Sequence, residues 1–131
     1  MTDILDAVTE LVPEYNITYG TNPPANGFCM IPAGGYQPDA HLDKGQVVRM
    51  DCLLNGKNQS QRTVYQALWD IHETLTKALA LEYPQSDDWQ IMDITTTSYP
   101  SLIGREEGTM QWIYGSSIEI KFYWKGDNAN G

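Results

Sequence analysis

The chain has 131 residues, a mass of 14.8 kDa and a formal net charge of −9, with 17 acidic residues against 8 lysines and arginines. This length suits a single domain, and the acidic excess excludes a protein whose affinity comes from contacts with phosphate groups. Because 41% of the residues are hydrophobic and only 19% are charged, we expect a folded domain rather than disorder. That domain is predicted to span residues 1–125, with a frayed tail over 126–131.

The N-terminal sequence lacks the basic stretch and the apolar run of a signal peptide, and no segment approaches the roughly 20 apolar residues that cross a bilayer. We therefore expect no contact with a membrane. Cys29 and Cys52 lie within apolar stretches, where buried, reduced thiols are the expected state in a reducing cytosol. The spacing alone leaves a disulfide between them open, because that bond depends on geometry.

The first third of the chain is predicted to form a short helix followed by two strands. Apolar residues over 3–12 repeat with the spacing of one helix face, and Pro13 ends this helix. Residues 15–19 alternate as a short strand and residues 27–31 read as a second one. The Gly and Pro content then predicts a loop over 32–38.

Charge is unevenly distributed, because every charged residue before Lys44 is acidic. We expect this region to be either a solvated acidic surface or a surface that meets a basic partner. The acidic residues concerned are Asp3, Asp6, Glu10, Glu14, Asp39 and Asp43.

The middle of the chain is predicted to form a strand over 46–54, a turn over 55–58 and the longest helix over 60–82, which Pro84 ends. Since His72 lies on the apolar stripe of this helix, we expect a core or interface histidine there rather than a metal ligand. The stripe predicts that the helix lies on a sheet, and it comprises Val64, Tyr65, Leu68, Trp69, His72, Leu75, Leu79 and Glu82.

The last third is predicted to form a strand over 89–97, a loop over 98–108 and a ribbon over 110–124. The ribbon is either one long bent strand or a hairpin with a loop at 115–117. As one strand it would be about 50 Å long, more than such a domain needs for its core, so we expect it to project and touch another molecule. The expected class is α+β: a mainly antiparallel sheet with a long C-terminal β-ribbon, one long helix packed on the sheet and a short N-terminal helix.

The residue types that support metal binding are not arranged for it. Zinc sites use close pairs of ligands, whereas Cys29, His41, Cys52 and His72 are spread singly along the chain. Thr76 occupies the place of the second histidine in the helical zinc-protease motif that would begin at His72. We therefore expect no metal site.

Catalytic patterns are also missing. The segment 115–117 lacks the strand-to-helix turn that presents a nucleophilic serine, and the neighbouring carboxylates of Glu106 and Glu107 would point apart on extended backbone. We expect no catalytic residue and no cofactor; the alternative is a pocket built from residues distant in sequence, which has no local pattern.

Residues 89–123 contain two stretches, Leu102-Ile103-Gly104-Arg105-Glu106-Glu107 and Gln111-Trp112-Ile113-Tyr114-Gly115-Ser116-Ser117. This segment resembles the small siphophage proteins, of the Gram-positive type, that are labelled minor capsid protein or tail terminator. The length and the order of elements also agree over most of the chain. Neither stretch carries a known chemistry, so the motif is moderately specific.

The resemblance implies a structural protein, not an enzyme, with an α+β fold. Its copies would form a ring, expected to be hexameric, at the top of the tail tube. Such a ring ends tail polymerisation and presents a surface for head docking. The implied partners are other copies of the chain, the tail tube protein and a head-completion or connector protein. The implied location is the head–tail interface of the virion, after assembly in the host cytoplasm.

Within this family, the apolar pair Leu102 and Ile103 is our first candidate for a contact with another subunit or with the tail tube. The alternative is a loop that folds back on its own core. The remaining interface candidates are Arg105, Glu106, Glu107, Trp112, Tyr114 and Tyr123. The net charge of −9 would line part of the ring channel with negative charge, so that genomic DNA passes without binding.

Two competing classes remain open from the sequence: a small cytosolic α+β enzyme or ligand-binding module, and a dimeric interaction domain. The oligomeric state separates them from the ring, because a stable monomer with a deep pocket would favour the enzyme.

Overall fold

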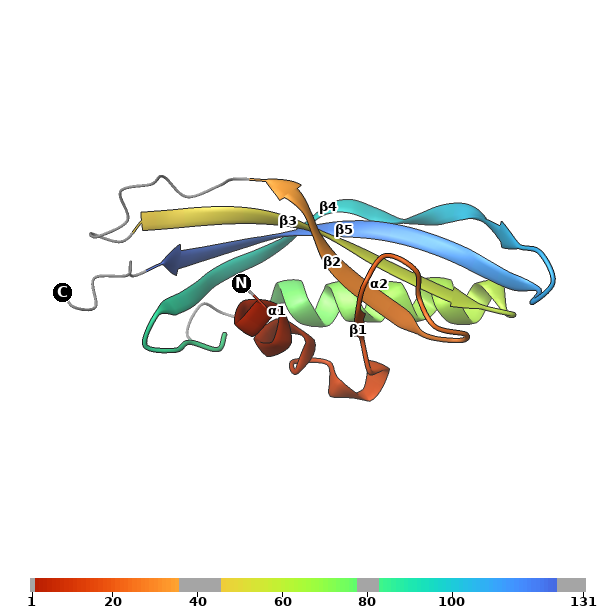
Figure 1. Ribbon diagram of the computed structural model, residues 1–131, viewed down its shortest axis with the longest axis horizontal. Coiled ribbons are helices and arrows are strands. Elements are labelled where there is room, and N and C mark those ends of the chain that lie inside the picture. Colours follow the sequence, from red (N-terminus) through yellow and green to blue (C-terminus); the bar gives the residue numbers. More distant parts are fainter. Residues whose placement is uncertain (1, 36–45, 78–82, 125–131) are drawn as a thin grey trace.

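The described residues form a five-stranded sheet and two α-helices. The computed structural model describes residues 2–35, 46–77 and 83–124 (Figure 1). The mainly antiparallel sheet, the long helix and the short N-terminal helix confirm the predicted α+β class. In chain order the elements are α1 (Thr2–Thr9), the 3-10 helix η1 (Pro13–Tyr15), β1 (Thr18–Tyr19), β2 (Phe28–Gly35), β3 (Gln46–Asn58), α2 (Gln61–Lys77), β4 (Trp89–Glu106) and β5 (Gln111–Trp124).

Strand β5 is an inner strand of the sheet and lies between β3 and β4, since the described order is β1-β2-β3-β5-β4. It pairs antiparallel with β3 along the whole of β3, and with β4 from Trp89 to Glu106. The short β1 pairs in parallel with β2. The predicted ribbon is therefore one long strand bordered on both sides, and not a hairpin. Gly115 lies within this strand.

The predicted turn over 55–58 and most of the predicted loop over 98–108 are wrong, because residues 55–58 and 98–106 belong to strands paired with β5. Asn55 lies opposite Gly115, for example. Pairing with a distant strand outweighs the turn-forming composition of these segments. The backbone of β4 is nevertheless irregular, because its pairing with β5 contains register shifts between Ile91 and Gly104.

The loop predicted over 32–38 is also wrong at its start, because residues 32–35 continue β2. The expected projection of the ribbon is limited to its end. Among the described residues, beyond the pair of Asn58 with Trp112, only the last residue of β4, the first residue of β5 and the turn over 107–110 extend past β3. Several positions named in the sequence analysis lie outside the described residues: 36–38, Asp39, His41, Asp43, Leu79, Glu82 and the tail over 126–131.

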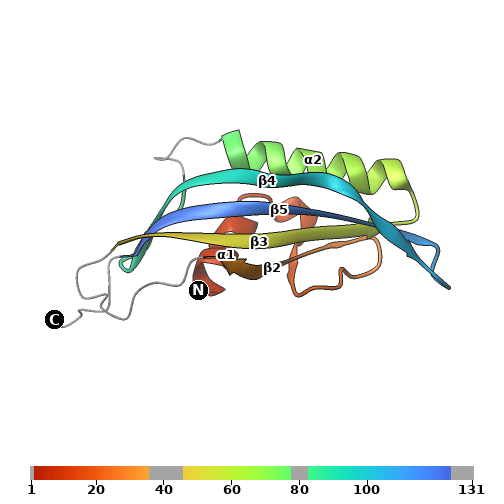
Figure 2. The same ribbon diagram turned by 90° about the horizontal axis from the view of Figure 1, so that it is seen from above.

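Both helices lie on one face of the sheet (Figure 1), and α2 runs alongside β4 when the sheet is seen from above (Figure 2). Alternate residues of the strands point toward the helices and are buried, as period-two alternation requires. Their burial supplies most of the hydrophobic free energy of folding. The core includes Ile4, Leu5 and Val8 from α1, Met50, Cys52 and Leu54 from β3, Leu68, Ile71 and Leu75 from α2, and Ile118, Ile120 and Phe122 from β5.

The apolar stripe predicted for the long helix is confirmed only in part. Val64, Leu68 and Leu75 are buried, as is His72. Tyr65 is 41% exposed and Trp69 is half-buried, so the aromatic side of the stripe lies at the margin of the core, next to β4. The stripe thus belongs to two environments, the core and the surface beside it.

Cys29 and Cys52 are both buried and free, as expected, so no disulfide joins them. Burial raises the pKa of the Cys52 thiol to about 12. The thiolate, which is the reactive form, is therefore suppressed at neutral pH, and this cysteine acts as a small core residue.

Gly56 provides a test of the packing between β3, β2 and α2. A Cβ atom at this position would lie 2.6 Å from Cδ1 of Phe28 and 3.0 Å from Cγ2 of Val64. We expect Gly56→Ala to lower the free energy of unfolding by roughly 1–3 kcal/mol, as overpacking does. Urea denaturation measures this change.

Gly104→Ala is the matched control, because no atom lies within 4 Å of the added Cβ and the residue is not among the glycines with positive φ. We expect a change within about 0.5 kcal/mol for this variant. Equal denaturation midpoints for both variants would contradict the described packing around Gly56.

Candidate interaction surface

The sheet face opposite the helices carries mixed charge and polar side chains. Arg49 of β3 lies opposite Lys121 of β5, and Asp51 lies opposite Glu119. Arg49 Nε is 3.7 Å from Oε1 of Glu119, an exposed ion pair that contributes little to stability. Such a face is typical of an antiparallel sheet with one solvated side.

The outer edge of β4 is different, because large apolar side chains are exposed there. Tyr99, Leu102 and Ile103 are 60%, 50% and 60% exposed. In the described part of the chain no further strand pairs with this edge. An open edge strand with exposed apolar residues is a surface on which another chain can dock.

Leu102 and Ile103, the first candidates from the sequence, lie in β4 and not in a loop. Leu102 lies opposite Tyr114. Ile103 falls at a register shift, and its Cδ1 would be 2.5 Å from a Cβ placed on Gly115. The side chain of Ile103 therefore uses the space that glycine leaves. Neither residue belongs to the hydrophobic core cluster.

Four aromatic rings form a connected group beside this edge, which we call the aromatic patch: Tyr65, Trp69, Tyr99 and Tyr114. The rings of Trp69 and Tyr99 stack with centroids 5.0 Å apart. Tyr65 contacts Trp69 at 6.2 Å and Tyr114 at 5.6 Å. The sequence identified only Tyr114 as an interface candidate. The spacing of Tyr65 and Trp69, four residues apart on a helix, was the available signal for the other rings.

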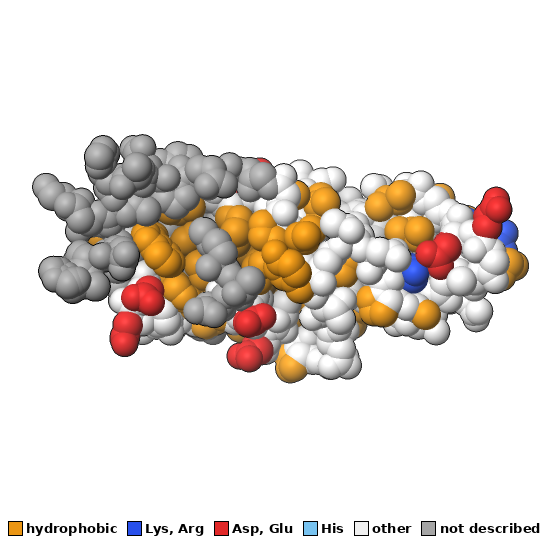
Figure 3. Space-filling view, viewed as in Figure 1, with side chains coloured by type: hydrophobic (Ala, Val, Ile, Leu, Met, Phe, Trp, Pro, Cys, Tyr) orange, Lys and Arg blue, Asp and Glu red, His pale blue; other side chains and the backbone are white. Residues whose placement is uncertain are grey.

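The end of the β4–β5 hairpin holds a second group of candidates. Cζ of Arg105 lies 5.1 Å from the ring centroid of Trp112, a cation–π contact. Arg105 also donates a hydrogen bond from Nη2 to Sδ of Met110, at 2.9 Å. Basic and acidic side chains lie next to one another at this end (Figure 3).

Glu106 holds this hairpin end against β3. It accepts hydrogen bonds from Oγ1 of Thr109 at 2.6 Å and from Nζ of Lys57 at 3.0 Å. These bonds, first that from Thr109, lower the pKa of the Glu106 carboxyl. The Lys57 side chain is only 7% exposed, so Glu106 compensates an ammonium that is nearly removed from water. Lys57 was missed from the sequence because a turn was predicted there.

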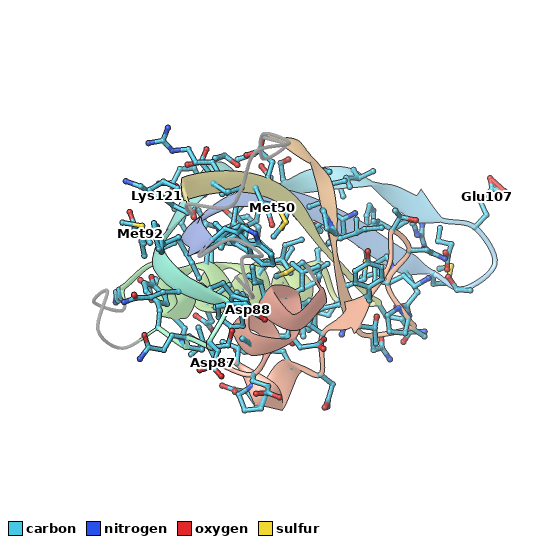
Figure 4. All side chains as sticks on the ribbon, turned by 60° about the vertical axis from the view of Figure 1, so that its left-hand side comes forward. Met50, Asp87, Asp88, Met92, Glu107 and Lys121 are labelled. Carbon is cyan, nitrogen blue, oxygen red and sulfur yellow. The ribbon has the colours of Figure 1, made fainter. Side chains whose placement is uncertain are left out.

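The last two candidates lie near opposite ends of β5. Glu107 is exposed at the tip of the β4–β5 hairpin, far from Met50, which lies between the sheet and α1 (Figure 4). Tyr123 is 36% exposed and lies opposite Val47, near the other end of β5. The structure thus brings together the candidates from Leu102 to Tyr114 and leaves Tyr123 remote from them.

A buried polar network joins α2 to the sheet through His72. Ser116 Oγ donates a hydrogen bond to the Leu54 carbonyl at 2.7 Å. Its only proton is thus used, so Nε2 of His72, 2.7 Å away, must be the donor to Ser116. Nδ1 of His72 then accepts from Thr96 Oγ1 at 2.7 Å.

This serine–histidine contact serves packing and not nucleophilic catalysis. In a catalytic pair the serine donates its proton to the imidazole, whereas Ser116 donates to Leu54. His72 is 2% exposed and Ser116 5% exposed. Burial lowers the pKa of His72 to about 4, so its imidazole is neutral at pH 7.

No group of three or more His, Cys, Asp or Glu side chains that could hold a metal ion occurs within residues 2–35, 46–77 and 83–124. Of the helices in these ranges, none has the length and apolar character needed to cross a membrane. No protein-family model matches the chain, and a search of curated proteins finds no significant match.

Glu106→Gln tests the hairpin anchor, because it leaves the buried ammonium of Lys57 without a charged partner. We expect a lower melting temperature, since breaking a buried ion pair from one side is destabilising. Glu107→Gln is the control, because this neighbouring carboxylate is exposed at the hairpin end. Thermal unfolding followed by circular dichroism compares the two; equal melting temperatures would exclude the anchoring role.

His72 makes stability depend on pH. Its pKa is about 4 in the folded protein and 6.5 ordinarily, so between these values the unfolded state binds a proton that the folded state does not. The stabilisation is complete above pH 6.5 and declines toward pH 4, by about 3 kcal/mol in total.

We expect His72→Gln to remove this dependence, so that the stability difference between wild type and variant is larger at pH 7 than at pH 5. Urea denaturation at both values measures it. A constant difference would show that His72 titrates normally in the folded protein.

Proposed function

We propose that this protein is a structural subunit of a phage tail. Its copies form a ring, hexameric in the simplest arrangement, that caps the tail tube, ends tube polymerisation and joins the tail to the head. The proposal combines the resemblance of residues 89–123 to tail terminators with one structural observation. That observation is the exposure of apolar side chains along the open edge of β4.

The exposed edge supports an interaction protein for physical reasons. Leu102 and Ile103 expose half or more of their surface, and the aromatic patch lies beside them. Exposed apolar side chains grouped on one edge strand are typical of contacts with other proteins. Aromatic side chains are enriched among the residues that dominate binding energy. A competing enzyme would need an accessible catalytic group, whereas the His72–Ser116 contact is buried.

The anchoring of the hairpin end supports the same function. Because Lys57 and Thr109 fix Glu106, the exposed residues of β4 are held in one geometry. Less conformational entropy is then lost when a partner binds. The partners in this proposal are other copies of the chain, the tail tube protein and a head-completion or connector protein.

The net charge of −9 also fits a ring around DNA. Negative charge on the channel would repel the phosphate backbone and let the genome pass without binding. A ring structure with a neutral or basic channel would contradict this part of the proposal.

The proposal is tested with the double variant Leu102→Asp, Ile103→Asp. Because both side chains are outside the core cluster, we expect an unchanged circular dichroism spectrum and melting temperature but no ring on the tail tube. Purified protein is mixed with the tail tube protein that the proposal names as its partner, and negative-stain imaging and native mass spectrometry report rings and tube length.

A matched control is Val47→Asp, Leu53→Asp, which changes side chains exposed by 44% and 38% on the solvated sheet face. This variant should still form rings and limit tube length. If wild-type protein neither forms a ring nor limits tube length, the proposed function is wrong. If the Leu102, Ile103 variant unfolds, those residues belong to the core and not to an interface.

A further inference from the structure

The aromatic patch is flanked by arginines that have no ion-pair partner in the described structure. The described ion pairs use Arg49, Lys57 and Lys77. Arg62 lies in a shallow hollow with Tyr65 and Tyr114, and Arg105 lies over Trp112 at the end of the hairpin. Trp, Tyr and Arg are the residue types that most often dominate the energy of protein interfaces.

The rings of this surface are ordered before any partner arrives. Trp69 and Tyr99 hold one another by stacking between α2 and β4, and Tyr65 is held between Trp69 and Tyr114. Tyr65 and Tyr99 nevertheless stay 41% and 60% exposed. The surface is therefore apolar and preorganised, and the guanidinium groups of Arg62 and Arg105 lie at its margin, which suits a partner with acidic and apolar groups.

The chain itself carries a second surface with exposed acidic and apolar side chains. Asp6 and Glu10, in and directly after α1, and Glu14 in η1 are exposed, and none forms an ion pair among the described residues. Among the coloured side chains of Figure 3, the basic ones appear toward the hairpin end and not beside α1. Tyr19, 61% exposed, adds apolar surface, and it lines a small hollow that also includes Asp6.

The two surfaces lie on opposite flanks of α2, so they cannot meet within one copy. Tyr65 and Trp69 lie on the flank beside β4. Asp70 lies on the other flank, close enough to Tyr15 of η1 for its charge to help raise the pKa of that phenol, after burial. A contact between these surfaces therefore requires a second copy.

We propose that the aromatic patch with Arg62 and Arg105 docks onto the acidic side formed by Asp6, Glu10 and Glu14 of a second copy of this chain. Because the two surfaces lie on opposite flanks of α2, each contact joins the aromatic patch of one copy to the acidic side of the next, so the contact is head-to-tail and repeats from copy to copy until a ring closes. This inference rests on the proposed ring function and names the surfaces that build the ring.

Charge reversal on each side tests the pairing. The double variant Arg62→Glu, Arg105→Glu and the double variant Glu10→Arg, Glu14→Arg should each assemble at least tenfold more weakly than wild type. An equal mixture of the two should restore rings in which the variants alternate. In such a ring the reversed patch of the Arg62→Glu, Arg105→Glu variant meets the reversed acidic side of the other variant. At the next contact the two unchanged surfaces meet, so opposite charges face each other at every contact.

Native mass spectrometry identifies the alternating ring by its mass, and circular dichroism checks that each variant is folded. Lys121→Glu, on the solvated sheet face, is the control and should assemble as wild type does. Rings that form normally from either double variant, or a mixture that stays disassembled, would overturn the assignment of surfaces while leaving a ring-forming wild type intact. A wild type that never forms rings would overturn the proposed function as well.

Discussion

The whole structure depends on the pairing of β5 with two neighbours along its length. Since β3 and β4 must match this central strand, both extend through segments whose composition favours turns. A sheet this long has one apolar face, which α1 and α2 cover. Within the described ranges, the pairing also leaves two surfaces uncovered: the solvated face and the edge of β4, where the apolar residues that we assign to partners are found.

Two polar links tie the rest of the molecule to this sheet. His72 connects α2 to β4 and β5 through Thr96 and Ser116, and the pair of Lys57 with Glu106 connects the hairpin end to β3. Buried polar groups contribute little net stability, but leaving one partner unsatisfied is costly. Such links therefore select one packing arrangement over shifted alternatives, and they hold the exposed edge in a fixed geometry.

The sequence predicts the features that depend on local periodicity. It does not predict the features that depend on pairing between strands distant in the chain. The burial of Val64, Leu68 and Leu75 in α2 and the shared parity of β5 follow from spacing alone. The strand character of residues 98–106 does not, because it arises from pairing with β5. For the same reason the sequence identified Leu102 and Ile103 as apolar and exposed but missed Tyr99, which stacks on a helix residue thirty positions earlier. His72 was expected in the core, yet its partners lie 24 and 44 residues away.

The acidic charge limits how copies of this chain can associate. Each copy carries a net charge of −9, so two copies repel at long range, although salt screens this repulsion beyond about 8 Å at physiological ionic strength. A two-fold contact through the acidic side of α1 would place Glu10 and Glu14 of both copies against like charges. A head-to-tail contact instead sets Arg62 and Arg105 against those carboxylates. Of these two arrangements, only the second sets opposite charges against each other at every contact, and it is the arrangement that closes into rings.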